Sequence, residues 1–139
     1  MAFPTKILLA TDGSKDAALA AQAAIDLSDQ SGAELHVVYV GHGSLTLSPA
    51  EYRAAAQERL DELAKQVEDA GGTVAEAHLR MDTEGGMEDE NIVSLAEELG
   101  ADLIVIGSRG LSGMKRLLMG SVSESVVRHA HCPVLVVRH

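Results

Sequence analysis

The sequence has one cysteine, very few aromatic residues and no long apolar run. A single cysteine, Cys132, excludes an intrachain disulfide and suits a reducing compartment. No stretch approaches the roughly 20 apolar residues that a membrane-spanning helix needs. The first residues, MAFPTKILLATDGS, also lack the basic and apolar regions of a secretory signal. We therefore expect a cytoplasmic protein without a membrane partner, whose core consists of Val, Leu, Ile and Ala.

Basic residues are scarce as well. Eleven Lys and Arg residues stand against 21 Asp and Glu residues, which gives a net charge of −10. A general nucleic-acid binder normally presents a basic face, so this balance argues against nucleic acid as a partner. It argues equally against attraction to anionic lipid. The length of 139 residues predicts a single domain, 1–139.

Apolar runs and helical stripes alternate along the chain. Short apolar runs bounded by turn residues predict strands at 5–10, 34–40, 73–79, 102–106 and 134–137. Helical spacing predicts helices over 15–31, from 49 to 70, ahead of Gly100, and over 122–130. The second helix has the clearest stripe, made of Tyr52, Ala56, Leu60, Leu63, Val67 and Ala70. The segment 80–90 is polar and predicts a loop that leads into the third helix.

Residues at the helix ends support these boundaries. Ser14 is a predicted N-cap, and Gly32 stands where a left-handed residue is expected after the helix. Ser48, Pro49 and Glu51 form a predicted capping box with proline at the first helical position. The alternation βαβαβαβαβ predicts an α/β fold with a parallel sheet covered on both faces. We expect the strand order 3-2-1-4-5, with ligand binding in the crevice outside the carboxyl ends of strands one and four.

A glycine-rich segment, 107–121, follows the fourth predicted strand at that crevice. It reads GSRGLSGMKRLLMGS and contains three basic residues and no carboxylate. Glycine allows a backbone to lie close to a ligand, and a helix start offers backbone N–H groups to an anion. The segment therefore predicts a phosphate site, although neither the P-loop string nor GxGxxG is present. An ordinary strand-to-helix loop is the alternative.

The surroundings of this segment make the pattern more specific. The strand before it reads LIVIGSRG, the sequence after it reads VSESVVRHAHCPVLVV, and residues 7–14, the first predicted strand and its turn, read ILLATDGS. Over nearly its whole length the chain resembles the universal stress protein family, in its ATP-binding branch. The resemblance implies a Rossmann-like, adenine nucleotide alpha hydrolase-like three-layer sandwich with a five-stranded parallel sheet.

The resemblance also implies a ligand and its binding residues. The ligand is ATP, with or without Mg²⁺, and AMP or cyclic AMP are the alternatives. The implied binding residues flank the crevice and are Thr11, Asp12, Val40, Ile106, Gly107, Arg109, Gly110, Gly120, Ser121 and Val122. Val40 is expected to contact adenine through its backbone. Gly120, Ser121 and Val122 are expected to supply N–H groups or a hydroxyl to the β- and γ-phosphates.

The function that the resemblance implies is stress-response regulation by a dimer, with at most slow ATP hydrolysis or autophosphorylation. The last strand, 134–137, is a predicted sheet edge that pairs antiparallel with the same strand of a second copy. The alternative is a dimeric adaptor protein whose nucleotide pocket is vestigial. The acidic segment 82–90 departs from the family pattern and either supplies a metal ligand or weakens triphosphate binding.

Several of these residues also have ordinary structural interpretations. Asp12 is typical of a turn whose side chain bonds the nearby backbone. Ser121 and Glu124 match a capping box, and the carboxylate of Glu124 would repel a phosphate at the same helix end. His129, His131 and Cys132 are possible metal ligands, but a helix-end histidine and a buried thiol are the favoured interpretation. We therefore predict no metal site among them.

Overall fold

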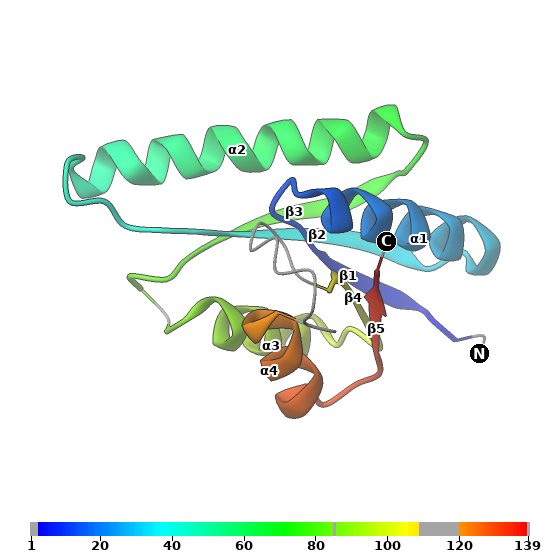
Figure 1. Ribbon diagram of the computed structural model, residues 1–139. Helices are drawn as coiled ribbons and strands as arrows, with labels where there is room; N and C mark the ends of the chain where they lie inside the picture. The colour runs from blue at the N-terminus through cyan, green and yellow to red at the C-terminus, as the bar shows by residue number, and fades with distance from the viewer. Residues whose placement is uncertain (1–2, 85, 109–119, 139) are drawn as a thin grey trace.

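A computed structural model of the protein describes residues 3–84, 86–108 and 120–138 (Figure 1). Strands and helices alternate along the chain as β1 (Lys6–Ala10), α1 (Lys15–Ser31), β2 (Glu34–Gly41), α2 (Pro49–Asp69), β3 (Val74–Met81), α3 (Glu88–Leu99), β4 (Leu103–Gly107), α4 (Ser121–His129) and β5 (Val134–Val137). The predicted βαβαβαβαβ order is confirmed.

All five strands are parallel and lie in the order β3-β2-β1-β4-β5. The central strand β1 pairs on both sides, because Ile7 lies opposite Leu35 of β2 and Leu103 of β4. The predicted strand order is therefore confirmed. It places the carboxyl ends of β1 and β4 side by side, at the point where the chain reverses direction across the sheet.

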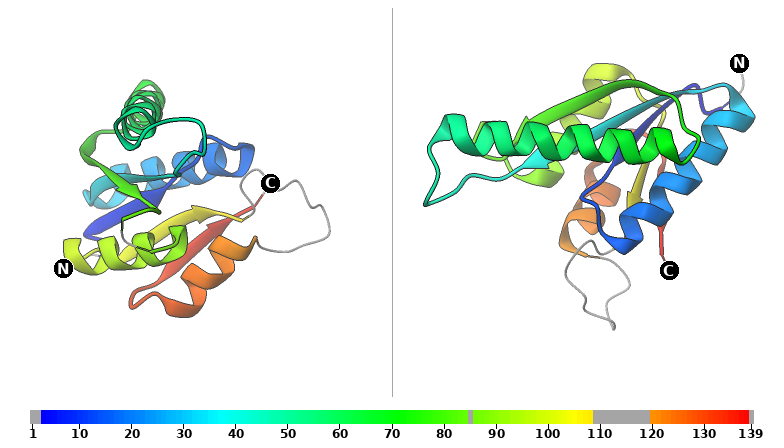
Figure 2. Two further views of the ribbon diagram at one scale, coloured as in Figure 1. Left: turned by 90° about the vertical axis from the view of Figure 1, so that its left-hand side faces the viewer. Right: turned by 90° about the horizontal axis from the view of Figure 1, so that it is seen from above.

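The helices form a layer on each face of the sheet, with α1 and α2 on one face and α3 and α4 on the other (Figures 1 and 2). Successive side chains of β1 alternate between the two cores. Ile7 and Leu9 join the core under α1 and α2, whereas Leu8 joins the core under α3 and α4. All three are fully buried, as expected for the central strand of a sheet covered on both faces.

Side-chain caps define where the first two helices begin. The Ser14 hydroxyl accepts a hydrogen bond from the Ala17 N–H at 3.2 Å. Ser48 and Glu51 form the predicted capping box, with bonds of 3.2 and 2.9 Å. The buried stripe of α2 contains the predicted Ala56, Leu60, Leu63 and Val67. Ala70 is exposed because the helix ends before it, so its predicted place in the stripe is wrong.

The loop predicted over 80–90 is shorter than expected. Strand β3 continues to Met81, which is buried, and the Asp82 N–H donates to the Gly41 carbonyl at 3.0 Å. A turn follows, and α3 begins at Glu88, where the Glu90 carboxylate accepts from the Met87 N–H at 3.1 Å. Strand β3 therefore extends beyond its predicted end at residue 79, because Arg80 and Met81 still pair with β2.

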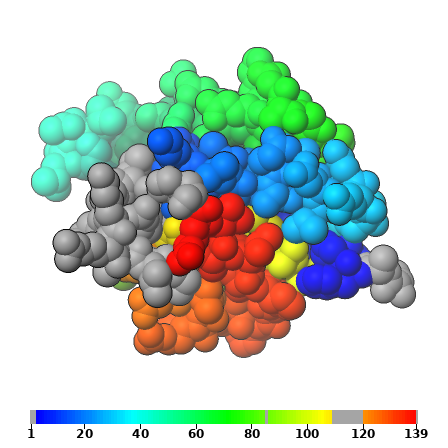
Figure 3. Space-filling view, turned by 45° about the vertical axis from the view of Figure 1, so that its right-hand side comes forward, coloured from blue at the N-terminus to red at the C-terminus, as the bar shows by residue number. Residues whose placement is uncertain are grey.

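Strand β5 lies at one edge of the sheet, where Figure 3 shows it at the surface between α1 and α4. Its only partner strand within the described residues is β4, and 37% of Leu135 is exposed. The predicted edge position is confirmed. Within the three described ranges, no helix combines the length and hydrophobicity that crossing a membrane requires.

Candidate functional site

Residues predicted to bind a nucleotide converge at the carboxyl edge of β2, β1 and β4. Thr11 follows β1, and its N–H donates to the Val38 carbonyl of β2 at 3.2 Å. Ala10 pairs with Ile106, the last buried residue of β4. Val40 is the penultimate residue of β2 and is also buried. The fold thus brings three separate strand ends to one crevice.

Asp12 forms the turn between β1 and α1. Its Oδ1 accepts the Ser14 N–H at 2.9 Å, and its carbonyl accepts a bond from the Arg59 guanidinium at 3.3 Å. The predicted turn role of Asp12 is confirmed. Gly13, beside it, has a φ of 83°, which favours glycine and lets the chain reverse sharply into α1.

Gly107 ends β4 and lies against the start of α1. A Cβ at this position would come within 2.8 Å of the Asp16 carbonyl carbon and 2.9 Å of the Ala17 nitrogen. These contacts involve backbone atoms, which a side chain cannot displace cheaply. Close packing of β4 on α1 is therefore sufficient to require glycine here, whether or not a ligand also approaches it.

Ser108 joins β4, α1 and α4, and its role could not be read from the sequence. Its hydroxyl donates to the Asp16 carboxylate at 2.5 Å, and its N–H donates to the Val137 carbonyl at 2.9 Å. Its carbonyl accepts the Gly120 N–H and the Ser123 hydroxyl, each at 2.5 Å. This network fixes the start of α4 next to the end of β4.

Helix α4 begins at the crevice with Gly120 as its N-cap. Gly120 has φ −76° and ψ 169°, and Ser121 and Val122 are the first two helical residues. Ser121 therefore does not cap the helix, and the predicted capping box with Glu124 is wrong. Glu124 pairs with Arg128 at 2.7 Å, which offsets the repulsion expected between its carboxylate and a phosphate. The first N–H groups of a helix have no partner within it and attract anions.

A pocket of about 600 Å³ opens beside this helix start, within the usual size range of small-molecule sites. Its lining comes from the ends of β2 and β3 and from the first turns of α3 and α4. The lining residues are His42, Asp82, Met87, Glu88, Asp89, Ser121, Val122 and Ser125. Only Ser121 and Val122 belong to the predicted nucleotide-binding residues. Asp82, Glu88 and Asp89 come from the acidic segment 82–90, which is predicted to supply a metal ligand or to weaken triphosphate binding.

Three carboxylates line the pocket, those of Asp82, Glu88 and Asp89, and the Asp89 carboxylate accepts a hydrogen bond from the Ser125 hydroxyl of α4 at 2.5 Å. Burial raises the pKa of Glu88, and the nearby Asp12, Asp82 and Asp89 raise it further, whereas His42 opposes the shift. The ring of His42 lies between two of these acids, with Nδ1 at 2.8 Å from Asp82 and Nε2 at 3.6 Å from Glu88. A phosphate in this pocket would therefore meet both the positive end of α4 and the negative charge of these carboxylates.

The predicted basic residues of the glycine-rich segment cannot be placed in this geometry. Arg109 and Gly110, together with Lys115 and Arg116, lie outside the described residues. Among the described lining residues, the start of α4 offers backbone N–H groups that favour an anion.

The histidines and cysteine near the end of α4 have structural partners. His131 pairs with Glu97 at 2.6 Å, and His129 lies 3.2 Å from the Ser125 hydroxyl. Cys132 packs against the core under α3 and α4, and burial raises the pKa of its thiol. These contacts agree with the structural interpretation of the three residues.

Comparison with known proteins gives consistent matches over the whole fold. The sequence profile of the universal stress protein family matches residues 4–138. Universal stress protein MJ0531 of Methanocaldococcus jannaschii is 36% identical over 143 residues, which cover 96% of this chain and 81% of the relative.

Two solved structures of such proteins contain an adenine nucleotide. The universal stress protein of Archaeoglobus fulgidus in complex with dAMP has a TM-score of 0.74 at 26% identity, covering 98% of this chain and 99% of that one. A universal stress protein in complex with cAMP also has a TM-score of 0.74 at 26% identity, covering 96% of both chains. The profile match, the identity and the shared fold agree, and the chain belongs to the universal stress protein family.

Proposed function

We propose that this protein binds an adenine nucleotide in the crevice at the carboxyl edge of its sheet and acts as a nucleotide-dependent stress-response regulator in the cytoplasm. The observation that carries the proposal is the start of α4, residues 120–122, opening onto a pocket of about 600 Å³. Support comes from two relatives of the same fold whose structures contain dAMP and cAMP. We expect at most slow ATP hydrolysis or autophosphorylation.

The proposed pose follows the order of the strand ends. Val40 contacts adenine through its backbone, while Asp12 and Ile106 lie beside the nucleoside. The phosphates lie at the start of α4, where the N–H groups of Ser121 and Val122 and the Ser121 hydroxyl face them. Gly107 and Gly120 lie along this path, at the end of β4 and the start of α4. ATP is the favoured ligand, and AMP and cyclic AMP are the alternatives.

The acidic side of the pocket fits a nucleotide that carries a divalent cation. Mg²⁺ usually binds one or two carboxylates together with phosphate oxygens and water. Asp12, Asp82, Glu88 and Asp89 provide carboxylates around the pocket that suit such an arrangement. We therefore expect Mg²⁺ to increase the affinity for ATP more than the affinity for AMP.

Isothermal titration of the wild-type protein with ATP, AMP, dAMP, cyclic AMP and adenosine tests the proposal directly. Each titration is done with and without Mg²⁺. Binding of at least one adenine nucleotide more tightly than its guanine counterpart supports it. If none of them binds with Mg²⁺ present, the nucleotide proposal fails, and a dimeric adaptor with a vestigial pocket replaces it.

Ser121→Ala should weaken ATP binding more than adenosine binding. A hydroxyl bonded to a charged phosphate oxygen contributes about 1.5–3 kcal/mol, which corresponds to about a 10- to 150-fold loss of affinity. Ser94→Ala, on the exposed side of α3, is the matched control and should change neither affinity. Equal losses for ATP and adenosine would place Ser121 away from the phosphates.

Glu88→Gln should increase nucleotide affinity by about two- to fivefold at pH 8 in the absence of Mg²⁺. A unit charge roughly 8 Å from a phosphate in a half-buried site contributes about 1 kcal/mol of repulsion. Because the pKa of Glu88 is raised, lowering the pH neutralises the wild-type carboxyl, and the difference between variant and wild type should shrink. Glu58→Gln on the exposed side of α2 is the control. If the difference in affinity between Glu88→Gln and the wild type grows as the pH falls, the charge of Glu88 is not what opposes the phosphates.

The edge strand β5 supports a further part of the proposal, which is dimerisation. One side of β5 pairs with β4, and the other side has no strand partner among the described residues. An exposed edge with apolar side chains normally finds a partner or causes aggregation. We propose that β5 pairs antiparallel with β5 of a second copy, which gives a two-fold symmetric dimer.

A further inference from the structure

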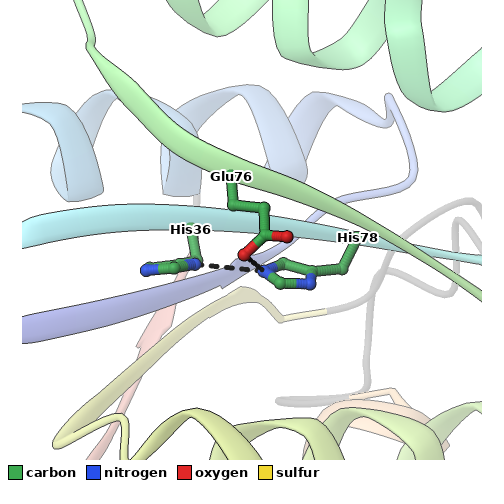
Figure 4. Close-up of side chains that lie close together, drawn as sticks. All are labelled: His36, Glu76 and His78. Carbon is green, nitrogen blue, oxygen red and sulfur yellow. Dashed lines mark hydrogen bonds and ion pairs between the residues drawn. The ribbon is translucent and has the colours of Figure 1, made fainter.

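A second group of polar side chains lies away from the nucleotide crevice, on β2 and β3. His36 comes from β2, and Glu76 and His78 come from β3 (Figure 4). Nδ1 of His36 lies 3.0 Å from Nε2 of His78, and a Glu76 oxygen lies 3.7 Å from that same Nε2. The possible ligand atoms of the three residues all lie within 4.8 Å of one another.

The parallel register brings these residues together from positions about 40 apart in the sequence. His36 lies opposite Glu76, and the next residue on the same face of β2, Val38, lies opposite His78. Val38 packs in the core under α3 and α4, so the three polar side chains occupy the α3 side of the sheet. The pairing changes register between Leu35 and His36, which sets this alignment.

Glu34 orients the first of the two rings. Nε2 of His36 lies 3.0 Å from a Glu34 carboxylate oxygen, and a carboxylate can only accept. Nε2 of His36 therefore carries the proton, and in the neutral ring Nδ1 presents its lone pair toward His78. Metal-binding histidines typically donate their second ring N–H to a carboxylate in this way, which fixes the tautomer and raises the basicity of the ligand.

The three side chains differ in how much solvent reaches them. The side chains of His36 and His78 are 7% and 10% exposed, whereas that of Glu76 is 64% exposed. Two buried rings thus lie beside a carboxylate that solvent reaches, which leaves an entry path for an ion.

We propose that Nδ1 of His36, Nε2 of His78 and the carboxylate of Glu76 form a binding site for a divalent transition-metal ion such as Zn²⁺. Imidazole nitrogen and carboxylate oxygen suit Zn²⁺, and three protein ligands leave a fourth position for water. Two nitrogens bound tetrahedrally at 2.0–2.1 Å lie about 3.3 Å apart. The observed 3.0 Å requires only a small opening of the pair. When the ion binds, His78 carries its proton on Nδ1.

This site is separate from the proposed nucleotide crevice. Along β2, His36 precedes Val40 by four residues, which is about 13 Å of strand. The pocket lining contains none of the three metal ligands. Metal binding here can therefore be measured independently of nucleotide binding, and failure of one proposal does not decide the other.

Competition between the protein and a chromogenic chelator for Zn²⁺ tests the site. The wild type should bind one tight equivalent, and His78→Gln should lose at least about 100-fold in affinity. Glu76→Gln changes an exposed side chain and keeps the fold, so its expected loss of about tenfold or more cannot arise from unfolding. Glu34→Gln should lose about 10- to 100-fold through misorientation of His36. His131→Gln, which changes an exposed histidine, should bind as the wild type does.

Two further readouts separate binding at this site from loose surface binding. Zn²⁺ should raise the thermal unfolding temperature of the wild type but not that of His78→Gln. Co²⁺ in place of Zn²⁺ should show the intense visible absorption of a four-coordinate site in the wild type and in His131→Gln only. The proposal is overturned if the wild type binds Zn²⁺ no more tightly than His78→Gln. It is likewise overturned if His131→Gln loses as much affinity as Glu76→Gln.

Discussion

Gly120→Val is expected to remove measurable nucleotide binding while leaving the protein folded. Gly120 is the N-cap of α4 and has extended backbone angles, φ −76° and ψ 169°, which valine also adopts readily. The fold should therefore tolerate the substitution. The added isopropyl group at the helix start would occupy the space in which the phosphates are proposed to lie. Isothermal titration with ATP, AMP and cyclic AMP measures the loss.

A graded substitution at the same residue provides the control. Gly120→Ala adds one carbon and should weaken binding less than valine does, with adenosine affected less than ATP. Thermal unfolding should show both variants within a few degrees of the wild type. Wild-type affinity in Gly120→Val would place the phosphates elsewhere, even if the protein proves to bind nucleotide.

Val136→Pro is expected to convert the proposed dimer into a folded monomer. The Pro133 carbonyl accepts from Ile104 of β4 and the Val137 carbonyl accepts from Ser108, directly after β4, so alternate residues of β5 face β4. Val134 and Val136 therefore direct their backbone groups away from the sheet, toward a second copy. Proline at 136 removes an outward N–H and leaves the bonds to β4 intact, as proline on an edge strand commonly does. Light scattering at micromolar concentration measures the change.

Val136→Ala separates the loss of the N–H from the loss of the side chain. It keeps the outward N–H and should remain largely dimeric, whereas Val136→Pro should not. Circular dichroism should show native helix content in both variants. A dimeric Val136→Pro, or a monomeric wild type, would show that β5 is not the interface.

The strand order could be predicted from the sequence because it follows from the alternation of strands and helices and from the right-handed connections between parallel strands. Apolar runs such as Leu103–Ile106 between helical stripes have few competing interpretations, and parallel connections wind in one direction. The position of the crevice then follows from the strand order alone. Helix caps with local side-chain partners, such as Ser48 with Glu51, were predictable for the same reason, since both partners lie within one turn.

The start of α4 could not be predicted because its partners are distant in the sequence. Ser121 and Glu124 have the spacing of a capping box, yet Gly120 takes the N-cap position. Its N–H bonds the Ser108 carbonyl, which also accepts the Ser123 hydroxyl. This tertiary network sets where the helix begins, and it overrides the local signal from Ser121.

The group of His36, Glu76 and His78 was missed for a related reason. Glu76 and His78 are two residues apart on β3 and therefore lie on the same face of the sheet. Nothing in the sequence, however, reveals which residue of β2 lies beside them. The register irregularity at Leu35 and His36 shifts that pairing by one position. A one-residue slip would turn His36 relative to its neighbours, so only the structure could identify the cluster.

The location of the proposed nucleotide site is tested most directly by amide chemical shifts of ¹⁵N-labelled protein during titration with AMP and with ATP–Mg²⁺. Saturable shifts are expected at Thr11, Val40, Ile106 and the start of α4, residues 120–122. The amides of His36 and His78, on the proposed metal site, should stay unchanged. Absence of saturable shifts with either nucleotide, or shifts confined to surfaces away from the carboxyl edge of the sheet, would contradict binding in this crevice.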